Sequence, residues 1–267
     1  MESWSLTRNN VRVEGQPQGQ PMVFAHGFGC DSNMWRYVWP PFADRYRIVL
    51  FDHVGHGGSD ASAFDEQRYA TLDGYAEDVL DICEALALED VVLVAHSVSA
   101  MIGVLAAARQ PERFARLVLV GPSPRYIDDG DYVGGFARED IDGLLESLES
   151  NYLGWSSAMA PAIMGNAERP ELGEELTNSF CRTDPRIAAH FARTTFLGDN
   201  RADLERVRTP SLVLQCSEDV IAPLAVGQYV HAHLRDSRFV LMSATGHCPN
   251  LSAPEETVAA IEAFLAT

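Results

Sequence analysis

Short apolar runs rich in Val, Ile and Leu alternate along the chain with longer segments that have apolar residues at helical spacing. Continuous apolar runs are typical of strands in a parallel sheet, because such strands are buried on both faces. We therefore predict seven strands, at residues 11–13, 22–25, 47–51, 91–95, 116–120, 211–216 and 238–242.

Helices are predicted between these strands. The clearest covers residues 72–88, where Leu72, Tyr75 and Val79 begin an apolar stripe and acidic residues take the opposite face. Residues 98–109 and 254–265 show similar patterns. Strands that alternate with helices indicate an α/β protein with a doubly wound sheet.

One connection is much longer than the few residues usual in α/β proteins. It follows the strand at 116–120, and its apolar spacing predicts four helices, at residues 139–150, 153–164, 172–181 and 185–194. We interpret residues 125–196 as a helical cap over the carboxyl edge of the sheet, where ligands of open α/β sheets bind. Residues 1–124 and 197–267 then form the core domain.

The composition narrows the classes of partner and location. The 267 residues carry a formal net charge of -18, which makes nucleic acid and anionic membranes poor partners. No run reaches the roughly 18 apolar residues that a membrane span needs, and residues 1–8 lack the pattern of a signal peptide. We expect a cytoplasmic protein.

Cysteine and histidine patterns give no sign of a metal site or a cofactor. The five cysteines are scattered without a CxxC pair, which predicts free thiols in a reducing compartment. His231 and His233 lie two apart on a predicted helix, so they do not face one another. We expect no metal and no cofactor.

Ser97 is the candidate nucleophile, because it directly follows one predicted strand and precedes a helix that opens with small residues. A serine on a sharp strand-to-helix turn is the nucleophile arrangement of the G-x-S-x-G motif. Here Ala95 and Ser99 replace the two glycines. A simple helix cap is the alternative role for Ser97.

A candidate base and acid follow in the chain. His247 lies on a loop after the last predicted strand, where its imidazole can take the proton of Ser97. Asp219 follows the strand at 211–216 and can orient that imidazole. The order Ser97, Asp219, His247 is that of α/β-hydrolases. Glu218 is the competing acid.

Acyl transfer also needs donors for the developing oxyanion. The loop His26-Gly27-Phe28-Gly29 follows an early strand, and the backbone N–H groups of Phe28 and Val98 are the candidate donors. We interpret His26, and the turn at residues 52–59, as structural.

Seven segments together resemble one family more closely than the serine motif does. HSVSAMIG at residues 96–103 resembles the nucleophile region of plant strigolactone and karrikin receptors. Other segments resemble the bacterial stress-response regulator RsbQ: TLDGYA, VGPSP, NYLGW, TDP, LQC and GHCP. The likeness extends over nearly the whole chain.

This resemblance implies an α/β-hydrolase fold with a mostly parallel eight-stranded sheet flanked by helices and an inserted four-helix cap. It implies a triad of Ser97, His247 and Asp219. The pocket would be apolar, and four residues are assigned to it: Phe136, Trp155, Met159 and Phe196. Met159 replaces an aromatic residue that is common in the family.

The resemblance leaves two functions open. The first is a serine hydrolase that cleaves a small apolar ester or lactone-like substrate through an acyl-Ser97 intermediate, in an RsbQ-like stress response. The second is a ligand receptor that acts through its cap on a regulatory partner, a phosphatase or a signalling protein, with little turnover. Ser97 argues against haloalkane dehalogenases and epoxide hydrolases, which attack with Asp, whereas haloperoxidase-like and C–C bond hydrolases use the same triad.

Overall fold

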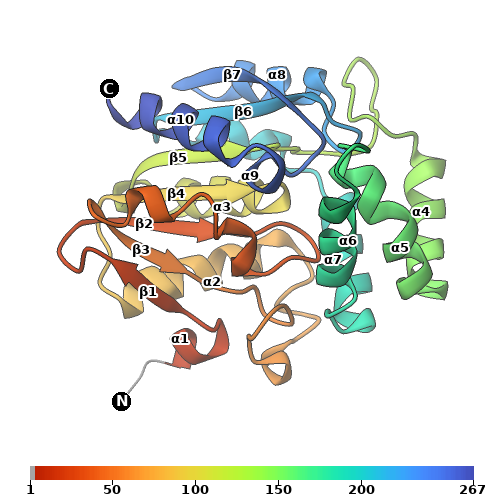
Figure 1. Cartoon of the computed structure of the whole chain (residues 1–267), viewed down its shortest axis with the longest axis horizontal. Coiled ribbons are helices and arrows are strands. Elements are labelled where there is room, and N and C mark those ends of the chain that lie inside the picture. The colour runs from red at the N-terminus through yellow and green to blue at the C-terminus, as the bar shows by residue number, and fades with distance from the viewer. Residues whose placement is uncertain (1–3) are drawn as a thin grey trace.

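A computed structural model describes residues 4–267. Its centre is one sheet with helices on both faces (Figure 1), and the strand order in the described residues is β1-β3-β2-β4-β5-β6-β7. The strands are β1 (Arg12–Gly15), β2 (Gln20–Ala25), β3 (Tyr46–Leu50), β4 (Val91–His96), β5 (Phe114–Val120), β6 (Ser211–Glu218) and β7 (Ser237–Thr245). All seven predicted strands are confirmed.

The middle strands are parallel and buried. Every residue of β4 is buried, and Val94 lies between Phe24 on β2 and Val118 on β5. Among the strands of residues 4–267, only β1 runs antiparallel to its neighbour, β3. The Val- and Leu-rich runs therefore form the centre of the sheet, because helices cover both of its faces.

The expectation of eight strands is wrong for the described residues. The segment before β1 forms a short helix, α1 (Trp4–Arg8), in place of a further edge strand. The buried Arg8 guanidinium lies 2.9 Å from Asp78 and 3.1 Å from Asp81 of α2. These ion pairs hold the segment against α2 and away from the sheet edge.

Three of the helices that pack on the sheet match those predicted at residues 72–88, 98–109 and 254–265, although the first ends three residues earlier. The helices that pack on the sheet are α2 (Leu72–Ala85), α3 (Val98–Arg109), α8 (Leu224–His233), α9 (Pro249–Ser252) and α10 (Pro254–Leu265). Short 3-10 turns connect them at Ser32–Trp35, Pro40–Phe42, Ala61–Ala63, Pro111–Arg113 and Arg201–Arg206. A β-carbon at Gly103 of α3 would lie only 2.9 Å from the Leu93 side chain, so this glycine lets α3 approach β4 closely.

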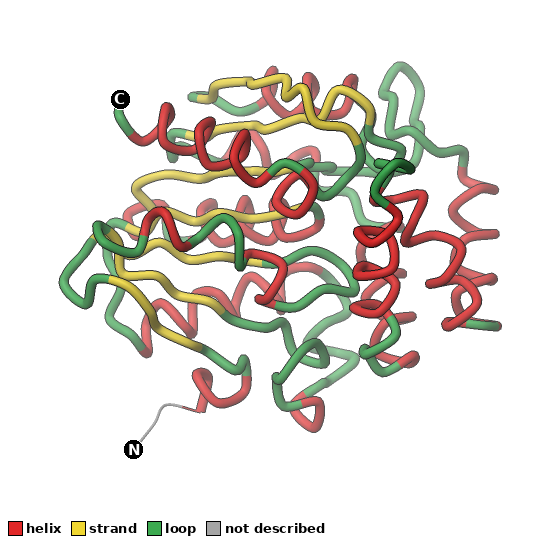
Figure 2. The backbone as a smooth tube through the Cα atoms, in the orientation of Figure 1, coloured by secondary structure: helices red, strands yellow, loops and turns green. Residues whose placement is uncertain are grey.

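Four helices between β5 and β6 form a separate layer beside the carboxyl ends of the strands (Figures 1 and 2). They are α4 (Arg138–Ser150), α5 (Tyr152–Met164), α6 (Pro170–Phe180) and α7 (Pro185–Phe196). All four were predicted, with bounds within two residues of these. We call them the α4–α7 layer; its independence as a domain spanning residues 125–196 stays a prediction.

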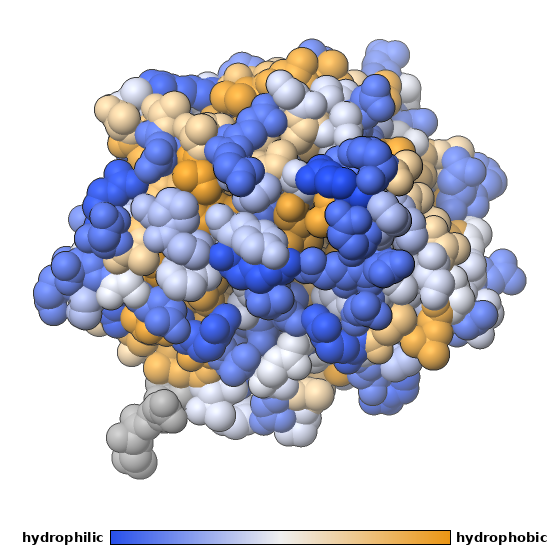
Figure 3. Space-filling view, in the orientation of Figure 1, coloured by the Kyte–Doolittle hydropathy of each residue, from blue (hydrophilic) through white to orange (hydrophobic). Residues whose placement is uncertain are grey.

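The surface in the Figure 3 view is mostly hydrophilic, with apolar side chains in scattered areas. Among residues 4–267, no helix combines the length and the apolar character that crossing a bilayer requires.

Candidate active site

Ser97 lies on the sharp turn between β4 and α3. Its backbone has φ 58° and ψ -125°, a left-handed conformation that is strained for a residue with a side chain. Its N–H donates to the Val120 carbonyl of β5 at 2.8 Å. Within the described residues, the hydroxyl makes no capping bond to α3, so it does not act as a simple helix cap.

The flanking residues explain why the two motif glycines can be absent. Ala95 and Ser99 are both buried. The Ser99 hydroxyl donates to the His26 carbonyl, and it lies 2.7 Å from His53 Nε2. A small side chain is tolerated at this position because two partners take up its polar atom.

The structure brings Ser97, His247 and Asp219 into one hydrogen-bonded chain, although they follow three different strands. His247 Nδ1 lies 2.7 Å from Asp219 Oδ2, and His247 Nε2 lies 2.7 Å from Ser97 Oγ. A carboxylate only accepts, so Nδ1–H donates to Asp219 and Nε2 accepts from Ser97. The serine proton therefore already points at the imidazole.

Asp219, and not Glu218, contacts the imidazole. Its other oxygen, Oδ1, accepts from the N–H groups of Ile221 at 2.8 Å and Ala222 at 3.0 Å. Burial alone would raise the pKa of Asp219, but His247 and these two N–H groups outweigh burial and lower it. Glu218 is exposed, because the β6 backbone turns its side chain to solvent.

The loop that carries His247 is held from two sides. The His247 N–H donates to the Ile163 carbonyl of α5 at 2.9 Å. The His247 carbonyl accepts from His96 Nε2 at 2.7 Å. Burial, followed by the charge of His247, lowers the pKa of His96 to about 3. A neutral His96 therefore supports the loop without adding a second positive charge at the site.

The backbone N–H groups of Phe28 and Val98 have no hydrogen-bond partner within residues 4–267. Val98 is the first residue of α3, where the helix dipole favours negative charge. Two free donors beside a nucleophile are what an oxyanion requires. Their assignment as the oxyanion hole stays a prediction.

A small cavity of ≈ 30 Å³ opens at Ser97 and His247. Two of the four predicted pocket residues, Trp155 and Phe196, line it. Tyr126 and Thr195 line it as well, and the sequence analysis missed both. Burial raises the pKa of Tyr126, and the nearby Ser97 offsets part of that increase.

The other two predicted pocket residues, Phe136 and Met159, are not among those that line this cavity. Phe136 pairs through its backbone with Tyr126, whose carbonyl accepts from the Phe136 N–H at 3.2 Å. Met159 is half-buried on α5. Both side chains pack against the hydrophobic core, so their place in the pocket is not supported.

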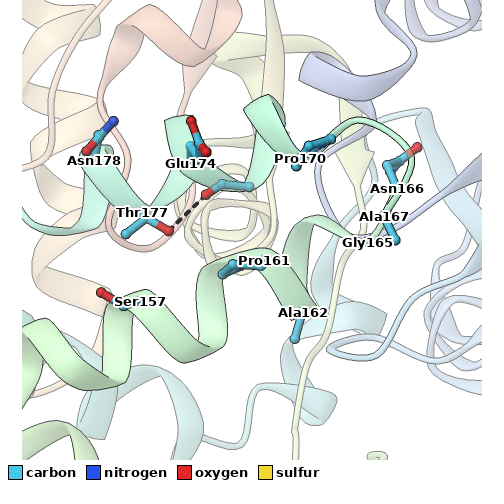
Figure 4. A pocket seen from close by; sticks show the side chains of 11 residues that line it. Ser157, Pro161, Ala162, Gly165, Asn166, Ala167, Pro170, Glu174, Thr177 and Asn178 are labelled. Carbon is cyan, nitrogen blue, oxygen red and sulfur yellow. Dashed lines mark hydrogen bonds between the residues drawn. The ribbon is translucent and has the colours of Figure 1, made fainter.

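A groove of ≈ 770 Å³ lies elsewhere, between α5 and α6 (Figure 4). Small side chains line it, among them Ser157, Pro161 and Ala162. Ser97 and His247 take no part in it. Its size follows from small residues on the two helices and not from a gap at the nucleophile.

Known proteins are similar to this chain in sequence and in fold. Residues 22–261 match the model of the alpha/beta hydrolase family. A strigolactone esterase of Arabidopsis thaliana is 40% identical over 249 residues, 92% of each chain. A karrikin insensitive 2 receptor of Petunia hybrida is 39% identical over 251 residues, 94% of this chain and 93% of its own.

Among solved structures, a hydrolase from Oleispira antarctica superposes with a TM-score of 0.95 at 38% identity and covers 99% of this chain and 97% of its own. The resemblance to strigolactone and karrikin receptors, inferred above from short segments, is confirmed over nearly the full length. The chain belongs to the alpha/beta hydrolase family.

Proposed function

We propose that this protein is a carboxylic ester hydrolase that cleaves a small apolar ester or lactone-like substrate through an acyl-Ser97 intermediate. The observation that carries the proposal is the 2.7 Å contact between Ser97 Oγ and His247 Nε2. It lies at a strained turn, beside two backbone N–H groups that have no partner in the described part of the chain. The esterase named among the relatives supports the same reaction class.

Acylation follows from this geometry. Ser97 Oγ attacks the ester carbonyl while its proton passes to His247 Nε2, and Asp219 stabilises the imidazolium that forms. The N–H groups of Phe28 and Val98 hold the tetrahedral oxyanion. The intermediate collapses when the bond to the alcohol oxygen breaks, and His247 returns the proton to the leaving alcohol.

Deacylation uses the same groups in reverse. His247 takes a proton from a water molecule, which attacks the acyl-Ser97 carbonyl. The bond to Ser97 Oγ then breaks, Ser97 regains the proton, and the carboxylic acid leaves. The apolar lining supports an apolar substrate, because Trp155, Phe180 and Ile221 offer it no charge.

The test is hydrolysis of p-nitrophenyl acetate by purified protein. Ser97→Ala is expected to lower kcat by at least about 10³-fold, since the loss of a triad member leaves only binding and oxyanion stabilisation. Ser62→Ala, at an exposed serine bonded to Asp60, is the matched control and should keep the parent rate. Equal rates for the parent and Ser97→Ala would overturn the proposal.

A second candidate is a receptor or regulator in which ligand occupancy controls a protein partner. The full-length likeness to a karrikin insensitive 2 receptor favours it. We propose that the α4–α7 layer would act as the cap and contact that partner, a phosphatase or another signalling protein. For the hydrolase candidate, the RsbQ-like segments support a stress-response pathway as the setting.

A quantitative pull-down from host extract separates the two candidates. The receptor function predicts a partner that the parent and Ser97→Ala capture to different extents when an ester ligand is added. Fast ester turnover with no ligand-dependent partner would exclude it. We propose a cytoplasmic location for either function. All five cysteines are free in the described residues, which supports a reducing compartment.

A further inference from the structure

Several helical hydroxyl groups in this protein bond to a carbonyl of their own helix. The buried Ser156 donates to the Tyr152 carbonyl at 2.8 Å, and Thr177 donates to the Gly173 carbonyl at 2.9 Å, the bond drawn in Figure 4. Each bond runs to the carbonyl four residues earlier and satisfies a polar atom without other partners.

Thr195 on α7 makes no such bond in the described residues. Its side chain is only 5% exposed, yet among residues 4–267 its Oγ1 has no hydrogen-bond partner. It lines the cavity that contains Ser97 and His247. Thr194, the preceding residue, donates to the Tyr69 carbonyl at 3.1 Å. The Thr209 and Ser252 hydroxyls are also buried without a partner in the described residues, but neither lines the cavity at Ser97.

A buried hydroxyl without a partner destabilises the folded protein, and a bound group that pairs with it recovers that loss. We propose that Thr195 is a specificity-determining residue whose hydroxyl donates to a second oxygen of the substrate, separate from the reacting carbonyl. The proposal rests on the hydrolase function for its kinetic test, but not for its binding test.

The residues around Thr195 indicate that the substrate atom that accepts its hydrogen bond is an ether, lactone-ring or ester oxygen. Such an oxygen accepts a hydrogen bond and brings no donor of its own, so nothing is left unpaired among Phe28, Phe196 and Ile221. The Trp155 Nε1 donor is also buried without a partner in the described chain. Variants at Thr195 separate its effect from that of the indole.

The kinetic test compares esters that differ only by an oxygen in place of a methylene. For the acyl side the pair is p-nitrophenyl methoxyacetate and p-nitrophenyl butyrate; for the alcohol side it is methoxyethyl acetate and butyl acetate. The measured quantity is the ratio of kcat/KM within each pair. Comparing this ratio between enzymes cancels the intrinsic reactivity of the esters.

Thr195→Val keeps the shape of the side chain and removes the hydroxyl. We expect the ether-to-hydrocarbon ratio to fall about fivefold in at least one pair, the loss of one hydrogen bond. Thr195→Ser keeps the hydroxyl and should keep the ratio. Thr194→Val is the matched control on the same helix and should also keep it. Ratios unchanged by Thr195→Val in both pairs would overturn the proposal.

The binding test removes the dependence on turnover. Calorimetry measures the affinity of the same esters for Ser97→Ala and for the double variant with Thr195→Val. The preference for the ether is expected in the first protein and not in the second. Equal affinities, or binding of neither member of a pair, would reject a role for Thr195, whereas an inactive parent enzyme with this preference intact would reject only the hydrolase function.

The melting temperature serves as a folding control. Because Thr195→Val replaces an unsatisfied hydroxyl with an apolar group of the same shape, the ligand-free variant should melt at the parent temperature or higher. A clear fall in melting temperature would show that the hydroxyl stabilises the fold, which contradicts the proposal.

Discussion

Four histidines lie buried around the turn that carries Ser97: His26, His53, His56 and His96. Burial lowers the pKa of all four, and neighbouring imidazoles add to this for three of them. His53 Nδ1 and His56 Nε2 have no partner within residues 4–267. These imidazoles are therefore neutral in the folded protein, and protonating them at low pH lowers the free energy of unfolding.

His56 gives a measurable pH effect on stability. Its pKa falls from 6.5 to about 3 on folding, so below pH 6.5 the unfolded chain binds a proton that the folded chain does not. The stabilisation is complete above pH 6.5 and is lost as pH falls toward 3. His56→Gln should reduce the slope of unfolding free energy against pH by about 1.4 kcal/mol per unit between pH 6 and 4. Urea unfolding at several pH values measures this, and an unchanged slope would contradict it.

At the same scale, the sequence placed some site residues and missed others for a physical reason. Ser97, Asp219 and His247 each follow a strand of the parallel sheet, and the carboxyl ends of such strands meet at one edge. Tyr126 and Thr195 depend on the path of a loop and on the rotation of α7. Neither quantity is encoded in a local pattern.

The end of α5 is tied to the loop that carries His247. Asn166, just beyond the helix, has φ 56°, and its amide donates to the Met164 carbonyl at 2.9 Å and the Thr245 carbonyl at 3.0 Å. The His247 N–H bonds Ile163 of the same helix. The position of the imidazole therefore depends on α5 as well as on β7.

Two substitutions at Asn166 separate the hydrogen bonds from the backbone strain. Asn166→Gly and Asn166→Ala both remove the bond to Thr245, and each should lower kcat roughly fivefold, which corresponds to about 1 kcal/mol. Asn166→Ala should in addition be less stable than Asn166→Gly by about 1 kcal/mol, because alanine is strained at positive φ. Ester kinetics and chemical unfolding measure the two effects. A parent-like kcat in both variants would show that this connection does not position His247.

Elements with strong periodicity could be predicted from the sequence, and the edge of the sheet could not. The apolar runs at β4 to β6 predict strands, and the apolar stripe at α2 predicts a helix. Residues 4–8 carry no such pattern, and the ion pairs of Arg8 with Asp78 and Asp81 decide their structure. Those contacts join positions about seventy residues apart, so no short stretch of sequence contains both partners.

The net charge of -18 acts on the molecule as a whole. A field of this sign slows the approach of anionic substrates, and salt screens it over a Debye length of about 10 Å at 0.1 M. We expect kcat/KM for p-nitrophenyl hemisuccinate to rise between 10 and 500 mM NaCl, while that for neutral p-nitrophenyl butyrate stays level. Parallel salt profiles for the two esters would contradict this expectation.

The cavity at Ser97 measures ≈ 30 Å³, whereas ligand pockets commonly measure about 300 Å³ or more. A substrate therefore enters only when the α4–α7 layer or the aromatic side chains below it move, and the product leaves by the same movement. Such a movement limits kcat in many enzymes.

Added glycerol should then slow kcat in proportion to solvent viscosity, with a burst of p-nitrophenol in the first turnover. In that case the helices around the cavity set the residence time of the acid product. This time determines how long each protein molecule stays occupied.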